Sequence, residues 1–324
     1  MAWLQFIVSA VLIIIAGARL TGSAEALGKN WGLGSGWAGV LLLPLATSLP
    51  ELVTSLRAAA IQAPDLAVGN LLGSNLFNIA IIALVDILQG KGSLLYRVRQ
   101  GHILAASLGI VLMAVVALGI ILPFPTIGGG WFGLDTLIIC GSYLFAARLL
   151  TTYEKQHLSP EDVQLRQLST RRAVIHFLLA ALVILAAGIT LTDAADVIAL
   201  ETGLGRTFVG SIMLAAATSL PEVVTTTTAV RLGKLDMALG NIFGANIFNM
   251  FILFIVDVFY VDGFLLQDIA IDHLLTILMG ILLTGVAIAG LIYRSQKSVG
   301  WIGFDALIIA GGYLIAFALL FFRG

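Results

Sequence analysis

The chain has 324 residues, of which 60% are hydrophobic and 11% are charged, and its mean hydropathy is +1.06. A soluble protein of this composition would lack a polar surface, so the sequence indicates an integral membrane protein that crosses the bilayer several times. The net charge of −1 gives no reason to expect nucleic-acid binding, and the single cysteine, Cys140, excludes a disulfide within the chain.

Ten apolar stretches are each long enough to cross a bilayer as a helix. In chain order they are 2–21, 34–62, 66–88, 101–122, 131–151, 172–190, 204–231, 236–260, 270–293 and 301–322. This pattern predicts an all-α polytopic membrane protein with ten transmembrane helices.

The second half of the chain repeats the first, with five expected spans in each half. The stretch ATSLPE at 46–51 returns at 217–222, so Glu222 follows Glu51 by 171 positions. The stretches GNLLGSNLFN and GNIFGANIFN follow the two copies at the same distance. Because five is an odd number of crossings, the second half must enter the membrane from the opposite side. The sequence therefore predicts two inverted repeats.

This repeat divides the chain into a first five-helix repeat at 1–151, a polar linker at 152–171 and a second, inverted five-helix repeat at 172–324. Of the 17 Lys and Arg residues, three lie on the side that carries both termini and fourteen lie on the opposite side. By the positive-inside rule, we expect the linker to be cytoplasmic and both termini to lie outside the cytoplasm.

Two carboxylates stand inside membrane-spanning stretches, at Glu51 and Glu222. A charged group at mid-depth costs roughly 3 kcal/mol or more, so such residues usually face a bundle interior and handle ions or protons. Pro50 and Pro221 directly precede them and should break their helices, because proline lacks the N–H and clashes with the preceding turn. A broken helix at mid-membrane is typical of the ion sites of transporters.

Neutral oxygen atoms accompany each carboxylate. We expect backbone carbonyls freed by the breaks at 44–47 and 215–218, and hydroxyl groups from Thr47, Ser48, Thr218 and Ser219. Hard cations such as Ca²⁺ bind six to eight oxygens of this mixed kind. The sequence offers no Cys or clustered His for a soft metal.

The third and eighth spans contribute amides. Asn75 and Asn78 lie three residues apart and share a helix face, with Ser74 beside them. The matching residues in the second half are Asn246, Asn249 and Ala245.

With these motifs, the sequence resembles the Ca²⁺:cation antiporter superfamily in its minimal prokaryotic sodium/calcium exchanger form. The matched stretches resemble the alpha repeats of that family, and the ten-span layout resembles it over the whole chain. The resemblance implies a secondary antiporter of the prokaryotic inner (plasma) membrane that exchanges Ca²⁺ for Na⁺ by alternating access. It implies no enzymatic activity, no cofactor and no obligate protein partner, because the transported ions are its substrates.

The resemblance also implies a ligand set. Glu51 and Glu222 would bind Ca²⁺ and Na⁺ in turn. The neutral ligands would be Thr47, Ser48, Ser74, Asn78, Thr218, Ser219 and Asn249. Two positions depart from the family, since some members have aspartate in place of Asn249 and many have serine in place of Ala245. The fixed charge of this site is therefore −2, which one Ca²⁺, two Na⁺ or two H⁺ would neutralise.

Other functions stay open from the residues alone. Exchange of Ca²⁺, or of another divalent cation, for H⁺ is the nearest alternative, because a desolvated glutamate readily takes a proton. A cation channel would need a continuous polar pore. An intramembrane enzyme would need a Ser–His, His-x-x-x-His or paired Asp arrangement at matching depth, which the sequence lacks.

Four further polar residues lie near span ends. His102 and His273 open the fourth and ninth spans, and Asp86 and Asp257 lie close to the ends of the third and eighth. We expect all four at the membrane interface, with a pH-sensing role as the alternative for the histidines.

Overall fold

The structure is a computed structural model that describes residues 1–30, 43–90, 92–122, 124–127, 132–156, 169–261, 263–295, 297–299 and 301–323. The first half contains α1 (Ala2–Asn30), α3 (Leu43–Thr47), α4 (Leu49–Ala60), α5 (Pro64–Gln89), α6 (Leu94–Arg97), α7 (His102–Ile121), β1 (Thr126–Ile127), β2 (Phe132–Gly133) and α8 (Leu134–Gln156). The second half contains α9 (Thr170–Thr202), α10 (Arg206–Phe208), the π-helix η3 (Val209–Leu214), α11 (Ala215–Thr218), α12 (Leu220–Arg231), α13 (Leu235–Phe259), α14 (His273–Tyr293), β3 (Ser298–Val299), β4 (Ile302–Gly303) and α15 (Phe304–Arg323).

The molecule is an all-helical membrane bundle, as expected, apart from two short antiparallel ladders. In these ladders Thr126 pairs with Gly133, and Ser298 pairs with Gly303. Within the described residues, eight helices are long and apolar enough to cross a membrane, or nine if the bent pair α10–α11 and α12 counts as one span. The expected second span, 34–62, begins at residues outside the described part of the chain. The number ten therefore stays a prediction.

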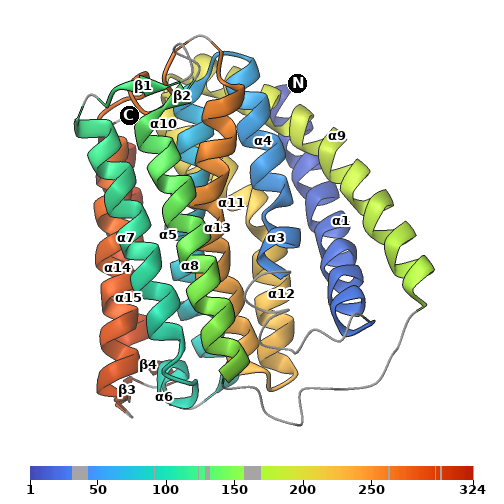
Figure 1. The fold of residues 1–324 in the computed structure, drawn as a ribbon, viewed down its shortest axis with the longest axis vertical. Helices are drawn as coiled ribbons and strands as arrows, with labels where there is room; N and C mark the ends of the chain where they lie inside the picture. Colours follow the sequence, from blue (N-terminus) through green and yellow to red (C-terminus); the bar gives the residue numbers. More distant parts are fainter. Residues whose placement is uncertain are drawn as a thin grey trace.

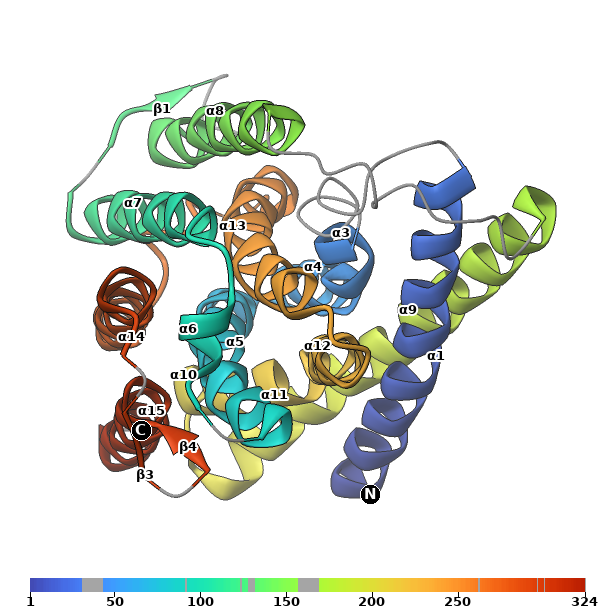
Figure 2. The same cartoon turned by 90° about the horizontal axis from the view of Figure 1, so that it is seen from below.

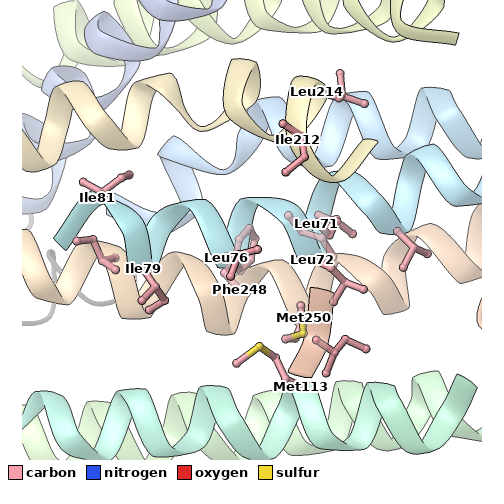
Figure 3. Packing of buried hydrophobic residues seen from close by; sticks show 14 of the residues in the cluster. Leu71, Leu72, Leu76, Ile79, Ile81, Met113, Ile212, Leu214, Phe248 and Met250 are labelled. Atoms are coloured by element: carbon pink, nitrogen blue, oxygen red, sulfur yellow. The ribbon is translucent and has the colours of Figure 1, made fainter. Parts of the chain in front are cut away.

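Helices α5 and α13 form the centre of the bundle (Figure 2). In each of them 72% of the most apolar stretch is buried, against 22–39% in the other candidate spans. Both helices are apolar around most of their circumference, which is typical of a helix surrounded by others rather than by lipid. Figure 3 shows Leu71, Leu72 and Leu76 of α5 packed between Ile212 of η3 and Met250 of α13.

Helices α1 and α9 pack along each other at one edge of the bundle, and both are inclined to the other helices (Figures 1 and 2). Two ion pairs tie α9 to the rest. Arg57 of α4 donates from Nε to Asp193 at 2.7 Å and from a terminal nitrogen at 3.0 Å, and Arg206 of α10 donates to Asp196 at 2.6 Å. These arginines are two of the three basic residues assigned to the termini's side of the membrane, and both are paired with carboxylates.

The two proline-containing helices break just before the proline. The residue at each break is a serine, Ser48 between α3 and α4 and Ser219 between α11 and α12, and the proline is in the first turn of the helix that follows. In the second half the two pieces are bent by 44° relative to each other. Proline is tolerated at these positions because the first N–H groups of a helix have no intrahelical acceptor.

Helix α5 approaches the π-helix η3 closely because two glycines face it. A Cβ added at Gly69 would lie 3.0 Å from the backbone nitrogen of Ser211, and one added at Gly73 would collide with the backbone oxygen of the same residue. The sequence patterns Gly-x-x-x-Gly permit such contact between membrane helices.

Asp86 and Asp257 lie near the ends of α5 and α13, and both are covered by protein. Both are buried, and each binds the backbone of both halves. Asp86 accepts hydrogen bonds from the N–H of Leu94 and, at 2.6 Å, from that of Gly303. Asp257 accepts from the N–H of Leu265 at 3.0 Å and from Gly133 at 3.1 Å. The carboxylates therefore satisfy backbone donors of loops that fold back onto the bundle.

The two histidines are also buried and link the halves. His102 Nε2 lies 3.1 Å from Asp236 Oδ1, at the start of α13, and His273 Nε2 lies 3.1 Å from Asp65 Oδ1, at the start of α5. Each histidine opens its helix, α7 or α14, and its ring is covered by protein, while its depth in the membrane stays a prediction. Both chain ends lie at the same end of the bundle (Figure 1).

Candidate cation site

The nine candidate ligands gather where the two broken helices meet α5 and α13. Every one of them is buried with 0% exposure: Thr47, Ser48, Glu51, Ser74, Asn78, Thr218, Ser219, Glu222 and Asn249. Full burial of this many polar side chains is costly unless each has a partner, so their contacts decide what the site can do.

The first glutamate binds hydroxyl groups of both halves. Ser219 donates to Oε1 of Glu51 at 2.9 Å, and Ser74 donates to the same oxygen at 3.4 Å. At the second glutamate, Ser48 donates to Oε1 of Glu222 at 3.4 Å. Each motif thus provides a serine to the carboxylate of the other motif.

Four oxygen atoms of the candidate ligands have no hydrogen-bond partner among the described residues. They are Oε2 of Glu51, Oε2 of Glu222, Oδ1 of Asn78 and Oδ1 of Asn249. A buried acceptor without a partner costs about 1–3 kcal/mol, and more if it is charged. Two carboxylate and two amide oxygens are the ligand types that hard cations take. These atoms therefore fit a bound cation.

The threonine hydroxyls donate to backbone carbonyls at the breaks. Thr47 donates to the carbonyl of Pro44 at 3.3 Å, and Thr218 donates to that of Ala215 at 3.2 Å. The same two carbonyls accept the N–H of Ser48 and Ser219, at 2.8 and 3.0 Å. Of the carbonyls expected to be free within 44–47 and 215–218, those of Pro44 and Ala215 are therefore hydrogen-bonded. The helix continues to the serine, and the carbonyls that lose a donor are those four residues before each proline, at 46 and 217.

Asn70 is part of this neighbourhood, although the sequence analysis did not single it out. Its Nδ2 lies 3.3 Å from the carbonyl of Glu51, 2.8 Å from Thr54 Oγ1 and 3.0 Å from Ser55 Oγ. Its Oδ1 accepts from Thr218 at 3.0 Å. Its position at the start of the first repeated GN stretch is the feature of the sequence that could have identified it.

The two halves of the site differ in detail. Asn241, which matches Asn70, donates to Thr226 at 3.2 Å, but its Oδ1 is without a partner in the described structure. Ala245 occupies the place that matches Ser74, so Glu222 lacks the second serine that Glu51 has. The side of Glu51 is therefore the richer in hydroxyl groups.

Asn75 and Asn246 were grouped with the ligand amides by sequence, but they bind each other. Asn75 Nδ2 donates to the carbonyl of Asn246, and Asn246 Nδ2 donates to the carbonyl of Asn75, both at 3.1 Å. They join α5 to α13 beside the carboxylates. No group of three or more His, Cys, Asp or Glu side chains placed to hold a metal occurs in the described residues, so a cation here would depend on neutral oxygens.

Comparison with known proteins places this geometry in context. A family model described as sodium/calcium exchanger protein matches residues 1–152 and 172–322. The chain is 28% identical over 323 residues to the inner membrane protein YrbG of Escherichia coli, an alignment that covers 97% of this chain and 95% of that protein.

Two solved structures share the fold. The sodium-calcium exchanger NCX_Mj, soaked with Na⁺ and Sr²⁺, aligns with a TM-score of 0.67 at 19% identity, covering 98% of this chain and 97% of that one. The H⁺/Ca²⁺ exchanger CAX aligns with a TM-score of 0.71 at 14% identity, covering 99% of this chain and 86% of that one.

Proposed function

Because the chain belongs to the sodium/calcium exchanger family, a family of transporters, we propose that it exchanges Ca²⁺ for Na⁺ across the membrane by alternating access. The observation that carries this proposal is the set of four buried oxygens without hydrogen-bond partners, contributed by two glutamates and two asparagines. Each of the four is an acceptor, and carboxylate and amide oxygens are the ligands that hard cations take.

The two glutamates bind the ions in turn. Their fixed charge of −2 is balanced by one Ca²⁺, by two Na⁺ or by two H⁺. An occupied, neutral site can cross the apolar interior at far lower cost than an empty site with two charges. Obligatory exchange follows, since the empty carrier is the species that cannot change sides.

The hydroxyl and amide groups complete the shell. Ser219 and Ser74 supply oxygens beside Glu51, and Ser48 supplies one beside Glu222. Asn78 and Asn249 add carboxamide oxygens from the two central helices. The threonines, Thr47 and Thr218, hold the helix ends at the breaks and offer their remaining lone pairs.

The architecture we propose is two inverted five-helix repeats, 1–151 and 172–324, with ten spans and a cytoplasmic linker at 152–171. Supporting it, matched positions make matched contacts, such as the reciprocal bonds of Asn75 and Asn246. A second observation supports this architecture: both chain ends lie at the same end of the bundle (Figure 1). The proposed orientation in the inner (plasma) membrane has both termini outside the cytoplasm.

A second candidate function is H⁺/Ca²⁺ exchange. It is favoured by the fixed charge of −2, which two protons neutralise as well as two Na⁺ do, and by the absence of the serine that Ala245 replaces. Protonated carboxylic acids need no oxygen shell, so a poorer shell at Glu222 costs H⁺ exchange less than Na⁺ exchange.

One flux experiment separates these functions. Purified protein in sealed vesicles loaded with radioactive Ca²⁺ is diluted into Na⁺, K⁺ or choline medium, with and without a pH gradient, at a clamped membrane potential. We expect Ca²⁺ efflux to require external Na⁺ and to be insensitive to the pH gradient. Efflux driven by the pH gradient without Na⁺ would establish H⁺/Ca²⁺ exchange. Efflux with no counter-ion at all would indicate a channel and refute antiport.

A further inference from the structure

Asn75 and Asn246 form a hydrogen-bonded ring between α5 and α13, and two further asparagines attach to it. Asn75 and Asn246 exchange bonds from side chain to backbone, both at 3.1 Å. Outside them, Asn78 Nδ2 donates to Asn246 Oδ1 and Asn249 Nδ2 donates to Asn75 Oδ1, both at 3.0 Å. All four side chains are at least 97% buried, since the largest exposure is 3%, at Asn246.

The orientation of all four amides follows from two backbone carbonyls. A carbonyl can only accept, so the carbonyl of Asn246 requires the NH₂ group of Asn75 to face it. The Oδ1 of Asn75 then faces Asn249 and requires a donor from that residue. Asn249 must therefore use its NH₂ group for this bond, which leaves its Oδ1 free.

The same sequence of requirements starts from the carbonyl of Asn75. That carbonyl requires the NH₂ group of Asn246 to face it. The Oδ1 of Asn246 then accepts from the NH₂ group of Asn78, which leaves the Oδ1 of Asn78 free. These two free oxygens are among the buried amide oxygens that have no hydrogen-bond partner in the part of the chain the structure describes. The ring thus determines which atom of each outer amide is offered to the cation.

We propose that Asn75 and Asn246 are positioning residues that turn the amide oxygens of Asn249 and Asn78 toward the transported cation and exclude a carboxylate from positions 249 and 78. This inference rests on the proposed function, since it assigns a role within the proposed cation site. An ionised aspartate at 249 has no hydrogen to donate, so one of its oxygens would face Asn75 Oδ1, acceptor against acceptor. Turning Asn75 over would relieve that contact only by opposing two acceptors at the carbonyl of Asn246.

The consequence for transport is a fixed site charge. With carboxylates excluded at both outer positions, Glu51 and Glu222 are the only ionisable ligands among the nine candidates, and the charge that the ions must balance stays at −2. The ring therefore sets how many charges accompany one Ca²⁺.

The test is a double-mutant experiment on Asn75 and Asn249. Asn249→Asp alone should raise the apparent KM for Ca²⁺ in vesicles by about tenfold, the order of the cost of one buried acceptor left without a donor. It should also lower the thermal unfolding midpoint of the Ca²⁺-free protein in detergent. Asn75→Ala added to Asn249→Asp should recover part of both losses, because it removes the opposed acceptor. Asn75→Ala by itself should raise KM about fivefold and leave the maximal rate within about twofold, since Asn249 then turns freely.

Asn241→Ala is the matched control, because Asn241 is a buried asparagine of α13 that bonds Thr226 outside the ring. It should lower the unfolding midpoint by the same amount with and without Asn249→Asp and should recover nothing. The mirror pair, Asn78→Asp with Asn246→Ala, repeats the test in the other half. If Asn249→Asp yields no folded protein, recovery of monodisperse protein in the double variant is the readout.

Additive losses in both pairs, or equal recovery by Asn241→Ala, would overturn the ring's positioning role. The unfolding midpoints are measured without Ca²⁺ and do not depend on transport. If the unmodified chain moves no Ca²⁺ with any counter-ion, the proposed function fails, while the recovery of the midpoint still decides whether the ring excludes a carboxylate.

Discussion

Ser219, in the second ATSLPE stretch, donates a 2.9 Å hydrogen bond to Glu51, in the first, across 168 residues of chain. Ser48 makes the corresponding contact with Glu222 at 3.4 Å. Each stretch therefore carries the carboxylate of its own half and a hydroxyl donor for the carboxylate of the other. Neither half can form the site alone, so a change in either stretch should affect the binding of the same ion.

We expect Glu51→Gln and Glu222→Gln each to reduce Ca²⁺ transport to below about a tenth, because one negative charge is left to balance a divalent cation, at a Coulomb deficit of several kcal/mol. Gln is nearly the same size as Glu, so both variants should still fold. The measurement is radioactive Ca²⁺ uptake by vesicles that contain equal amounts of folded protein.

Glu201→Gln is the control, since Glu201 is exposed near the end of α9. It should transport at the rate of the unmodified chain. Robust Ca²⁺ uptake by folded Glu222→Gln would refute a site shared by the two carboxylates.

The fully buried Ala245 should limit Na⁺ affinity. We expect Ala245→Ser to lower the Na⁺ concentration for half-maximal exchange about twofold to fivefold and to leave Ca²⁺ affinity nearly unchanged. One added hydroxyl is a large share of the shell of a monovalent ion and a small share of a shell of about seven oxygens around Ca²⁺. The measurement is Ca²⁺ efflux during an Na⁺ titration at two pH values.

Ser74→Ala is the reverse experiment, because Ser74 is the matching hydroxyl and lies 3.4 Å from Glu51 Oε1. It should raise the Na⁺ requirement. If Ala245→Ser leaves the Na⁺ curve unmoved and changes its pH dependence instead, Na⁺ is not the driving ion.

The buried Asp86 should act on stability rather than on transport. Asp86→Ala removes the acceptor for the N–H groups of Leu94 and Gly303, so we expect it to lower the free energy of unfolding by about 1–3 kcal/mol for each donor left unpaired. Asp86→Asn keeps one acceptor oxygen and should lose less. The measurement is the thermal unfolding midpoint in detergent together with the KM for Ca²⁺. A changed KM at an unchanged midpoint would show that Asp86 belongs to the ion pathway.

The contact between Gly73 and Ser211 should be necessary for the packing of α5 against η3. We expect Gly73→Ala to lower the unfolding midpoint and the transport rate, because the new Cβ would meet a backbone oxygen that cannot turn away. Gly141→Ala is the matched control, since nothing lies within 4 Å of a Cβ added there. Equal behaviour of the two variants would mean that the close approach is dispensable.

The orientation in the membrane can be measured by cysteine labelling in a Cys140→Ala background. A cysteine at position 159, in the linker, should react with a membrane-impermeant reagent from the cytoplasmic side only, and cysteines added at either terminus should react from the outside only. The uneven distribution of Lys and Arg motivates this expectation. Both termini labelled from the cytoplasm would contradict the orientation, and termini labelled from opposite sides would contradict the ten-span inverted repeat.

Much of the site was visible in the sequence because it is repeated. The recurrence of ATSLPE singled out Glu51 and Glu222, and the structure brings both to one place with Ser74 and Ser219. The helical membrane fold and the family were also confirmed. The roles of the nine residues as ligands stay a prediction, which the variants above test.

Contacts between elements were not predictable from one sequence. Helix periodicity places Asn75 and Asn78 on one face, but it does not say that Asn75 meets the carbonyl of Asn246 while Asn78 keeps a free oxygen. Which of the two amides keeps a free oxygen depends on how α5 and α13 cross. The partner of Asp257 was unpredictable for a related reason, since only the fold brings Gly133 to it.

The ion pair between Arg57 and Asp193 constrains how the protein is made. The two residues are 136 positions apart, so at about 5–20 residues per second the ribosome delivers the aspartate about 7–27 seconds after the arginine. During that interval the guanidinium of Arg57 lacks its counter-charge, and α4 has no α9 to pack against. Loss of Asp193 should therefore reduce the amount of protein in the membrane more than it reduces the activity of each molecule that arrives.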